Sequence, residues 1–260
     1  VRLAIFGGGV IGRRHAVAVS AVEDAKLVAI ADIGDSGRQL AAEMGVPLHL
    51  DYRDLLDKED IDGVIVATPT EHHFHPTVSS LAAGRHVLVE KPIMVSLEEA
   101  DQVVAKVRES GFEVLVGHHR RYYGVIHKAR KILRSGELGK LVAVNGQWTA
   151  RKADEYYDLD WRKKWEAGPI LTNLIHEIDT LRYICGDIES VSADISYEVR
   201  NWNKEDAAAI VLRFVNGAIG TFILSDQVSS PWAWEFATGE TAFFPQSTQN
   251  VVRFMGTKAS

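Results

Sequence analysis

The sequence predicts an α/β protein that begins with a doubly wound parallel sheet and continues into an α+β domain with a large open, mainly antiparallel sheet. Strand and helix patterns alternate up to residue 120, which is typical of parallel strands joined by right-handed crossovers. Beyond it strand patterns dominate, and Asn216-Gly217 between two of them is a strong hairpin signal. We therefore expect one domain over residues 1–120 and a second over residues 121–260.

The elements expected in the first domain are strands at 2–6, 26–32, 63–67, 86–90 and 113–117, and helices at 10–22, 35–44, 74–83 and 96–110. Ser96 and Glu99 form a capping box at the start of the last of these helices. Sheets of this kind bind ligands at the carboxyl ends of their strands. The segments that directly follow the strands are therefore the first place to look for a site.

The elements expected in the second domain are a helix at 125–135, a strand at 140–150, a charged aromatic loop at 151–168, a helix that opens at Pro169, and strands at 189–200, 207–215 and 218–225. The chain lacks an initiator methionine and stops soon after the strand-like run 251–254. We therefore expect the natural protein to continue past Ser260.

The composition is that of an ordinary globular protein, with 46% hydrophobic and 25% charged residues. A net charge of −6 gives no reason to expect nucleic acid or an anionic membrane as a partner. No apolar run approaches the ~20 residues of a membrane span, and the early glycines do not resemble a signal peptide. The single cysteine, Cys185, excludes an internal disulfide and fits a cytoplasmic location.

The strongest functional signal directly follows the first strand. Gly7, Gly9 and Gly12 have the spacing G-x-G-x-x-G, which allows a tight turn, a close approach of a diphosphate to the backbone, and close packing of helix on strand. The helix that starts at Val10 and Ile11 directs free N–H groups and the positive end of its dipole at the phosphates. This segment predicts a dinucleotide site.

Two further residues complete the prediction of a cofactor site. Asp32 ends the second strand 20 residues after Gly12, where a carboxylate accepts both ribose hydroxyls. An anion there repels a 2′-phosphate, so NAD is expected in preference to NADP. In Glu90-Lys91-Pro92, a lysine follows a buried strand and would lie over the same cofactor. Together these features predict a nicotinamide-dependent oxidoreductase.

The helix after Pro169 is expected to carry the substrate chemistry. One face is apolar and should be buried, and the opposite face carries Thr172, Asn173, His176, Asp179, Thr180 and Tyr183. By itself such a face is most often simply solvated. The preceding loop, however, holds more aromatic and charged residues than a linker needs, which predicts the wall of a polyol pocket.

The histidine pairs and clusters do not predict a metal site. His72, His73 and His75 do not direct three imidazoles at one ion, and neither they nor His118 and His119 have acidic or cysteine partners at suitable spacing. No metal is expected.

The order of these motifs resembles the glucose–fructose oxidoreductase/inositol dehydrogenase (Gfo/Idh/MocA) family. The matching segments are Gly7/Gly9/Gly12, Asp32, Thr68-Pro69-Thr70-Glu71-His72-His73, Glu90-Lys91-Pro92, Gly117-His118-His119-Arg120-Arg121-Tyr122, and Gly168-Pro169 leading to His176 and Asp179. The resemblance spans essentially the whole chain. It implies an N-terminal Rossmann domain and a C-terminal domain whose open sheet forms a homodimer or homotetramer interface.

The resemblance also implies roles for individual residues. Lys91 would contact both the substrate hydroxyl and the nicotinamide ribose, and His176 would be the acid or base on the reacting oxygen. The cofactor would further be lined by Thr68, Pro69, His73 and Glu90, and the substrate by Arg120, Tyr122, Trp161, Arg162, Thr172 and Asn173. An imidazole that titrates near neutrality suits proton removal, and a lysine cation stabilises a developing alkoxide.

Two positions depart from the family pattern. Many dehydrogenases of the family have an aspartate four residues before the histidine, where this chain has Thr172. Thr70 likewise replaces the usual asparagine of the Thr-Pro-Asn segment. We interpret both changes as subfamily features. Three functions therefore stay open: an NAD-dependent dehydrogenase of a sugar, cyclitol or related polyol, a glycosidase-type enzyme with internal redox, and a non-catalytic dinucleotide-binding regulator.

Overall fold

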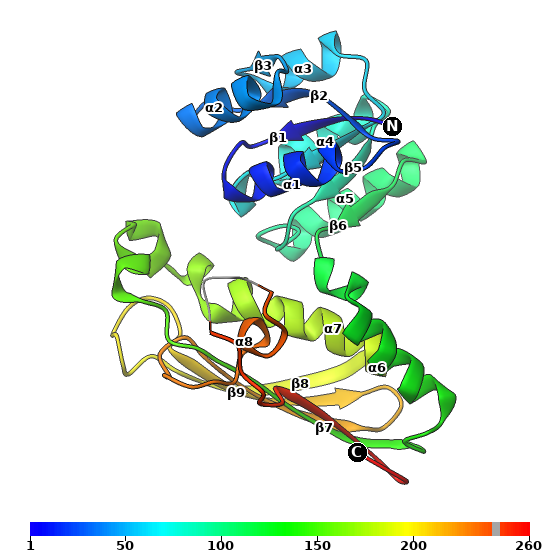
Figure 1. Cartoon of the computed structure of the whole chain (residues 1–260), viewed down its shortest axis with the longest axis vertical. Coiled ribbons are helices and arrows are strands. Elements are labelled where there is room, and N and C mark those ends of the chain that lie inside the picture. The colour runs from blue at the N-terminus through cyan, green and yellow to red at the C-terminus, as the bar shows by residue number, and fades with distance from the viewer. Residues whose placement is uncertain (241–244) are drawn as a thin grey trace. The chain divides into compact units, whose positions relative to one another are not determined.

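We analysed the protein as a computed structural model that describes residues 1–240 and 245–260, without the side chain of Trp161. The chain divides into two compact units, Val1–His118 and His119–Ser260. Each unit is built around its own sheet (Figure 1). No helix among the described residues is long and apolar enough to cross a membrane.

The first unit is a parallel six-stranded sheet in the order β3-β2-β1-β4-β5-β6. Its strands are β1 Arg2–Phe6, β2 Lys26–Ala31, β3 Leu48–His49, β4 Gly63–Val66, β5 His86–Val89 and β6 Val114–Val116. Strand order reverses on either side of β1, because β2 pairs with one edge of β1 and β4 with the other. This reversal creates the position at which parallel sheets bind ligands, at the carboxyl ends of β1 and β4.

Helices join these strands, as the alternating pattern predicts. They are α1 Val10–Ser20, α2 Asp35–Met44, α3 Tyr52–Lys58, α4 Phe74–Ala82 and α5 Leu97–Ser110, with the 3-10 turns η1 Thr70–His72 and η2 His119–Tyr122, the latter opening the second unit. The Ser96 hydroxyl caps α5 by accepting the Glu99 N–H at 3.2 Å, which confirms half of the expected capping box. Two apolar clusters, one on each side of the sheet, form the core.

The second unit contains a five-stranded sheet in the order β11-β7-β10-β9-β8. Its strands are β7 Leu141–Thr149, β8 Ile188–Ser196, β9 Ala207–Phe214, β10 Ile219–Ser225 and β11 Val252–Gly256. All neighbours are antiparallel except β7 and β10, which run parallel. The sheet is therefore mainly antiparallel, as expected, and Asn216-Gly217 forms the β9–β10 connection with Gly217 at φ +88°.

Helices cover one face of this sheet (Figure 1). They are α6 Gly124–Ser135, the π-helical turn η6 Ile170–Leu174, α7 Ile175–Cys185 and the short α8 Trp234–Thr238, and the 3-10 turns η3 Asp154–Tyr157, η4 Asp160–Lys163 and η5 Trp165–Ala167 fill the predicted loop. Along β9 buried and exposed side chains alternate, so one face packs on the helices. On the other face Val211, Ile219 and Ile223 are exposed.

Candidate active site

The glycine turn after β1 has the geometry that its spacing predicts. Gly7 has φ +96°, and a Cβ there would lie 2.6 Å from the Ala67 carbonyl oxygen. A Cβ on Gly12 would strike the Gly7 carbonyl oxygen, whereas a Cβ on Gly9 would meet nothing within 4 Å. Gly7 and Gly12 are thus needed for close packing, and Gly9 leaves open space at the start of α1. Val10 and Ile11 are exposed beside that space.

Asp32 closes the turn from the end of β2. Its carboxylate accepts the Gly8 N–H at 2.5 Å and the Gly34 N–H at 2.6 Å, one on each oxygen. Gly37 packs so tightly on Asp32 that a Cβ would overlap this side chain. The carboxylate is held in a fixed orientation and remains half-buried, with further lone pairs for other donors.

Glu90 connects the end of β5 to its neighbours. Its carboxylate contacts His15 Nε2 at 2.8 Å and accepts the Lys91 N–H at 3.1 Å, and Gly117 has no room for a Cβ beside it. Burial raises the pKa of Glu90, but the His15 and Lys91 contacts outweigh it and hold that pKa below its usual value. Glu90 therefore fixes the segment that carries Lys91, and the cis Lys91–Pro92 bond follows directly.

The structure corrects the expectation that His73 lines the cofactor. Its side chain is 1% exposed, with Nδ1 2.9 Å from the Pro92 carbonyl oxygen and Nε2 2.8 Å from that of Thr68. Both ring nitrogens are engaged by backbone. His73 thus joins the segment after β4, with the half-buried Thr68 and Pro69, to the segment that carries Lys91.

The helix that carries His176 begins irregularly. Residues Ile170–Leu174 form a π-helical turn before α7, and the Ile170 N–H donates to Glu205 Oε1 at 2.7 Å. Thr172 Oγ1 lies 2.9 Å from the Gly168 carbonyl oxygen and 2.9 Å from Asn173 Oδ1. Because π-helical turns are rare and frequently occur at functional sites, this turn supports a functional role for Thr172 and Asn173.

The polar face of α7 is not solvated. His176, Asp179 and Thr180 are all buried, which contradicts the simplest interpretation of the sequence pattern. Asp179 forms a bidentate ion pair with Arg121 at 2.7 and 2.5 Å. The His176 ring contacts the His119 ring edge-on, with 5.1 Å between centroids.

Arg120 is likewise not placed to contact a substrate. It is 3% exposed and binds Glu177 at 2.5 Å and Glu235 at 2.7 Å, with its guanidinium over the Trp234 ring. Burial raises the pKa of Glu177 to about 7, although the Arg120 cation opposes that shift. We therefore correct the expectation that Arg120 binds substrate. Arg120 instead neutralises the buried carboxylates of Glu177 and Glu235.

The other residues predicted to bind the substrate differ in their exposure and in their contacts. Tyr122 is exposed, and Arg162 donates to the Tyr156 carbonyl oxygen at 2.9 Å while its guanidinium lies over the Tyr156 ring. The side chain of Trp161 lies outside the described part of the chain. Across the described residues there is no group of three His, Cys, Asp or Glu side chains that could hold a metal ion.

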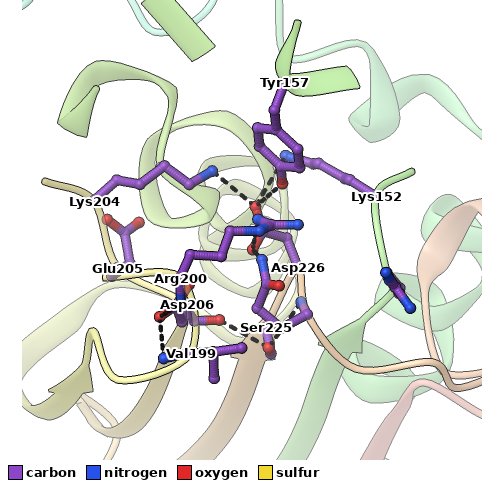
Figure 2. Close-up of polar contacts among 12 residues, drawn as sticks. Lys152, Tyr157, Val199, Arg200, Lys204, Glu205, Asp206, Ser225 and Asp226 are labelled. Carbon is purple, nitrogen blue, oxygen red and sulfur yellow. Dashed lines mark hydrogen bonds and ion pairs between the residues drawn. The ribbon is translucent and has the colours of Figure 1, made fainter. Parts of the chain in front are cut away.

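Sequence reasoning missed Lys152 and Asp226. Both follow strands of the second sheet, and Figure 2 shows Lys152, Tyr157, Arg200 and Lys204 gathered around the Asp226 carboxylate. Lys152 also donates to Asn173 Oδ1 at 3.0 Å. The only signal in the sequence was position, because each residue comes just after a predicted strand.

Comparison with known families matches both units. Residues 1–118 match the oxidoreductase family with an NAD-binding Rossmann fold, GFO_IDH_MocA, and residues 126–260 match a GFO/IDH/MocA C-terminal domain. The chain belongs to this family. Its membership confirms the resemblance read from the motifs, including the Rossmann fold of the first unit.

Individual relatives of the chain are longer than it is. A myo-inositol 2-dehydrogenase of Thermotoga maritima is 28% identical over 85% of this chain and 67% of its own length. A scyllo-inositol 2-dehydrogenase (NAD(+)) of Bacillus subtilis is 31% identical, over 85% of this chain and 66% of its own length. A 2,7-anhydro-N-acetylneuraminate hydratase of Mediterraneibacter gnavus is 27% identical, over 79% of this chain and 56% of its own.

A solved structure agrees closely with this fold. The WlbA dehydrogenase of Bordetella pertussis, in complex with NADH and UDP-GlcNAcA, superposes with a TM-score of 0.86 at 26% identity, over 99% of this chain and 71% of that one.

Proposed function

We propose that this protein is an NAD-dependent oxidoreductase that transfers hydride between a hydroxyl of a sugar, cyclitol or related polyol and nicotinamide. The observation that carries the proposal is the fixed Asp32 carboxylate beside an open glycine turn, in a chain whose second unit also matches the family. Relatives named as inositol dehydrogenases support the substrate class.

The proposed chemistry needs two groups from the protein. Bound NAD supplies the hydride acceptor. The role assigned to His176 is to take the hydroxyl proton, and that assigned to the Lys91 cation is to stabilise negative charge as it develops on the substrate. Glu90 and His73 fix the segment of Lys91, while the π-helical turn presents Thr172 and Asn173 for the other substrate hydroxyls.

NAD is the proposed cofactor in preference to NADP. The Asp32 carboxylate is anchored by two backbone N–H groups and cannot move away from a 2′-phosphate without breaking them. Repulsion between these anions would disfavour NADP, whereas two ribose hydroxyls can donate to the same carboxylate.

A second candidate function also uses NAD but does not oxidise the substrate overall. Two relatives are named 2,7-anhydro-N-acetylneuraminate hydratases, and hydration leaves the overall oxidation state unchanged. In an enzyme of this type hydride would leave the sugar and return to it within one turnover. Release of NADH separates this candidate from a dehydrogenase.

We further propose a cytoplasmic homodimer or homotetramer assembled through the exposed face of the second sheet. That face carries Val211, Ile219 and Ile223, apolar side chains that gain from burial against a second copy. The lone buried Cys185 suits a reducing compartment.

The test of the function is direct. The purified protein is incubated with NAD and a panel of sugars, cyclitols and polyols while NADH absorbance is followed. The proposal expects NADH to accumulate with at least one of them. A protein that binds NAD tightly but converts no compound of the panel would instead support the regulator.

A further inference from the structure

Lys152 and Asp226 lie side by side at the carboxyl ends of two parallel strands. The register of β7 and β10 ends with Thr149 opposite Ser225. Backbone pairing continues beyond it, because the Lys152 N–H donates to the Asp226 carbonyl oxygen at 3.1 Å. The paired backbones therefore fix the positions from which the Lys152 and Asp226 side chains extend.

The Asp226 carboxylate is a buried anchor for cations (Figure 2). It has no exposed surface, and its Oδ2 accepts the Tyr157 hydroxyl at 2.7 Å and Lys204 Nζ at 3.0 Å, with Lys152 Nζ 3.8 Å away. Burial raises the pKa of Asp226, but Lys152, Tyr157 and Lys204 together hold that pKa below its usual value. Asp226 is thus an anion at neutral pH and attracts the Lys152 ammonium.

The same ammonium determines which way the Asn173 amide points. Lys152 Nζ lies 3.0 Å from Asn173 Oδ1, and the Thr172 hydroxyl lies 2.9 Å from that oxygen. An ammonium has donors and no acceptor, so only the carbonyl end of the amide can face it. The Nδ2 end must then point away, and it donates to none of the described residues, while Asn173 stays partly exposed.

We propose that Lys152 is a positioning residue that holds the Asn173 amide with its two N–H donors toward the substrate. The inference rests on the proposed function, because it assigns Asn173 to the polyol. A fixed amide of this orientation selects a substrate oxygen that accepts hydrogen bonds, and a flipped amide would present a second acceptor to that oxygen. Lys152 therefore sets specificity without contacting the reacting atoms.

The first test needs no substrate. The side-chain amide resonances of Asn173, identified by their loss in Asn173→Ala, are followed by two-dimensional NMR of the whole chain. Lys152→Met removes the donor at similar length and should shift these resonances. Lys204→Met is the matched control, because Lys204 contacts the same carboxylate but not Asn173, and should leave them in place. Unmoved resonances in Lys152→Met, or equal shifts in both variants, would overturn the proposal.

The second test uses a polyol that the wild type oxidises. Lys152→Met should raise KM about 10- to 100-fold while kcat changes less than about threefold, since a charged hydrogen bond is lost outside the reacting centre. Lys152→Arg keeps a donor and should restore part of the loss. In Asn173→Ala, the additional substitution Lys152→Met should change neither KM nor kcat further, because the amide that Lys152 positions is already absent.

Additive effects of the two substitutions would show that Lys152 acts elsewhere and refute the inference. A wild type that oxidises no polyol would count against the proposed function instead, and the NMR experiment would still decide the position of the amide.

Discussion

The imidazole ring of His119 lies edge-on to that of His176, with 5.1 Å between centroids and 75° between ring planes. His119 Nε2 is in turn 2.6 Å from Glu240 Oε1. Burial raises the pKa of Glu240, but His119 and Arg120 outweigh it and keep that pKa low. An imidazole–carboxylate pair thus adjoins His176, in a chain with threonine at position 172.

This arrangement predicts unequal effects at the two histidines. His176→Ala should lower kcat by about 10²- to 10⁴-fold and remove the pH dependence that an imidazole gives near neutrality. His119→Phe keeps an aromatic ring against His176 and should lower kcat by less than about tenfold. A pH–rate profile that is identical in the wild type and in His176→Ala would show that the proton leaves by another route.

Thr172 offers a complementary test. Thr172→Ala removes a hydroxyl that contacts Asn173 and should have a small effect on kcat. Thr172→Asp places an anion one helical turn before His176, which should move the rising limb of the pH–rate profile to higher pH. Equal profiles for the two variants would argue against His176 as the titrating group.

Cofactor preference should depend on Asp32. In calorimetry the wild type should bind NAD more tightly than NADP, and Asp32→Ser should narrow or reverse the difference by about 1–3 kcal/mol. Asp35→Ser is the control, because Asp35 is a neighbouring exposed acid whose one ion pair among the described residues is with Arg38. Tighter binding of NADP by the wild type would contradict the assignment of Asp32 to the ribose.

Glu177 should make the protein less stable as pH rises. Its pKa is about 7 in the folded state and 4.5 ordinarily, so the folded state holds its proton more tightly than the unfolded state. The resulting stabilisation is complete below pH 4.5 and is lost as pH rises through 7. Urea unfolding should therefore show that the wild type loses about 1–3 kcal/mol relative to Glu177→Gln between these limits.

If the free energy of unfolding differs between the wild type and Glu177→Gln by the same amount across that pH range, Glu177 ionises normally. Comparison with the amide variant matters because other buried carboxylates, such as Asp226, have lowered pKa values and contribute a slope of opposite sign.

The open sheet face should carry the subunit contact. Val211→Lys with Ile223→Lys places two charges on that face and should convert an oligomer to a monomer in light scattering. Val104→Lys, at an exposed position on α5, should leave the mass unchanged. A monomeric wild type at micromolar concentration would refute the proposed assembly.

Most of the fold could be predicted because, over a long segment, the spacing of apolar residues indicates which face of a helix or strand is buried. Helices such as α5 and strands such as β9 match their predicted ranges closely. The strands and α-helices missed were β3, of two residues, α3, of seven, and α8, of five, which are too short to show a clear period. The apolar face of α7 is buried as predicted, at Leu174, Leu181 and Cys185. Burial of its polar face could not be predicted, because it involves tertiary contacts such as the Arg121–Asp179 pair, whose residues are 58 positions apart.

In the candidate site, too, the features set by short motifs could be predicted and those set by tertiary packing could not. Gly7 and Gly12 belong to one short turn, and Asp32 lies 24 residues after Gly8 at the end of the next strand, where the spacing of the dinucleotide motif places an acid. The Arg120–Glu177 pair joins residues 57 positions apart, and the Tyr157–Asp226 pair joins residues 69 apart. Such pairing depends on tertiary packing, so no spacing rule shows that Arg120 is committed to carboxylates or that Lys152 holds Asn173.

Transfer of deuterium from a polyol labelled at the carbinol carbon tests the central claim most directly. Hydride transfer predicts that the label appears in NADH with the wild type, and that Lys91→Ala, though folded and able to bind NAD, transfers it about 10²- to 10⁴-fold more slowly. Label in NADH at an undiminished rate in Lys91→Ala would contradict the role of Lys91. Label that never leaves the polyol, with NAD bound and every substrate class tested, would contradict the account as a whole.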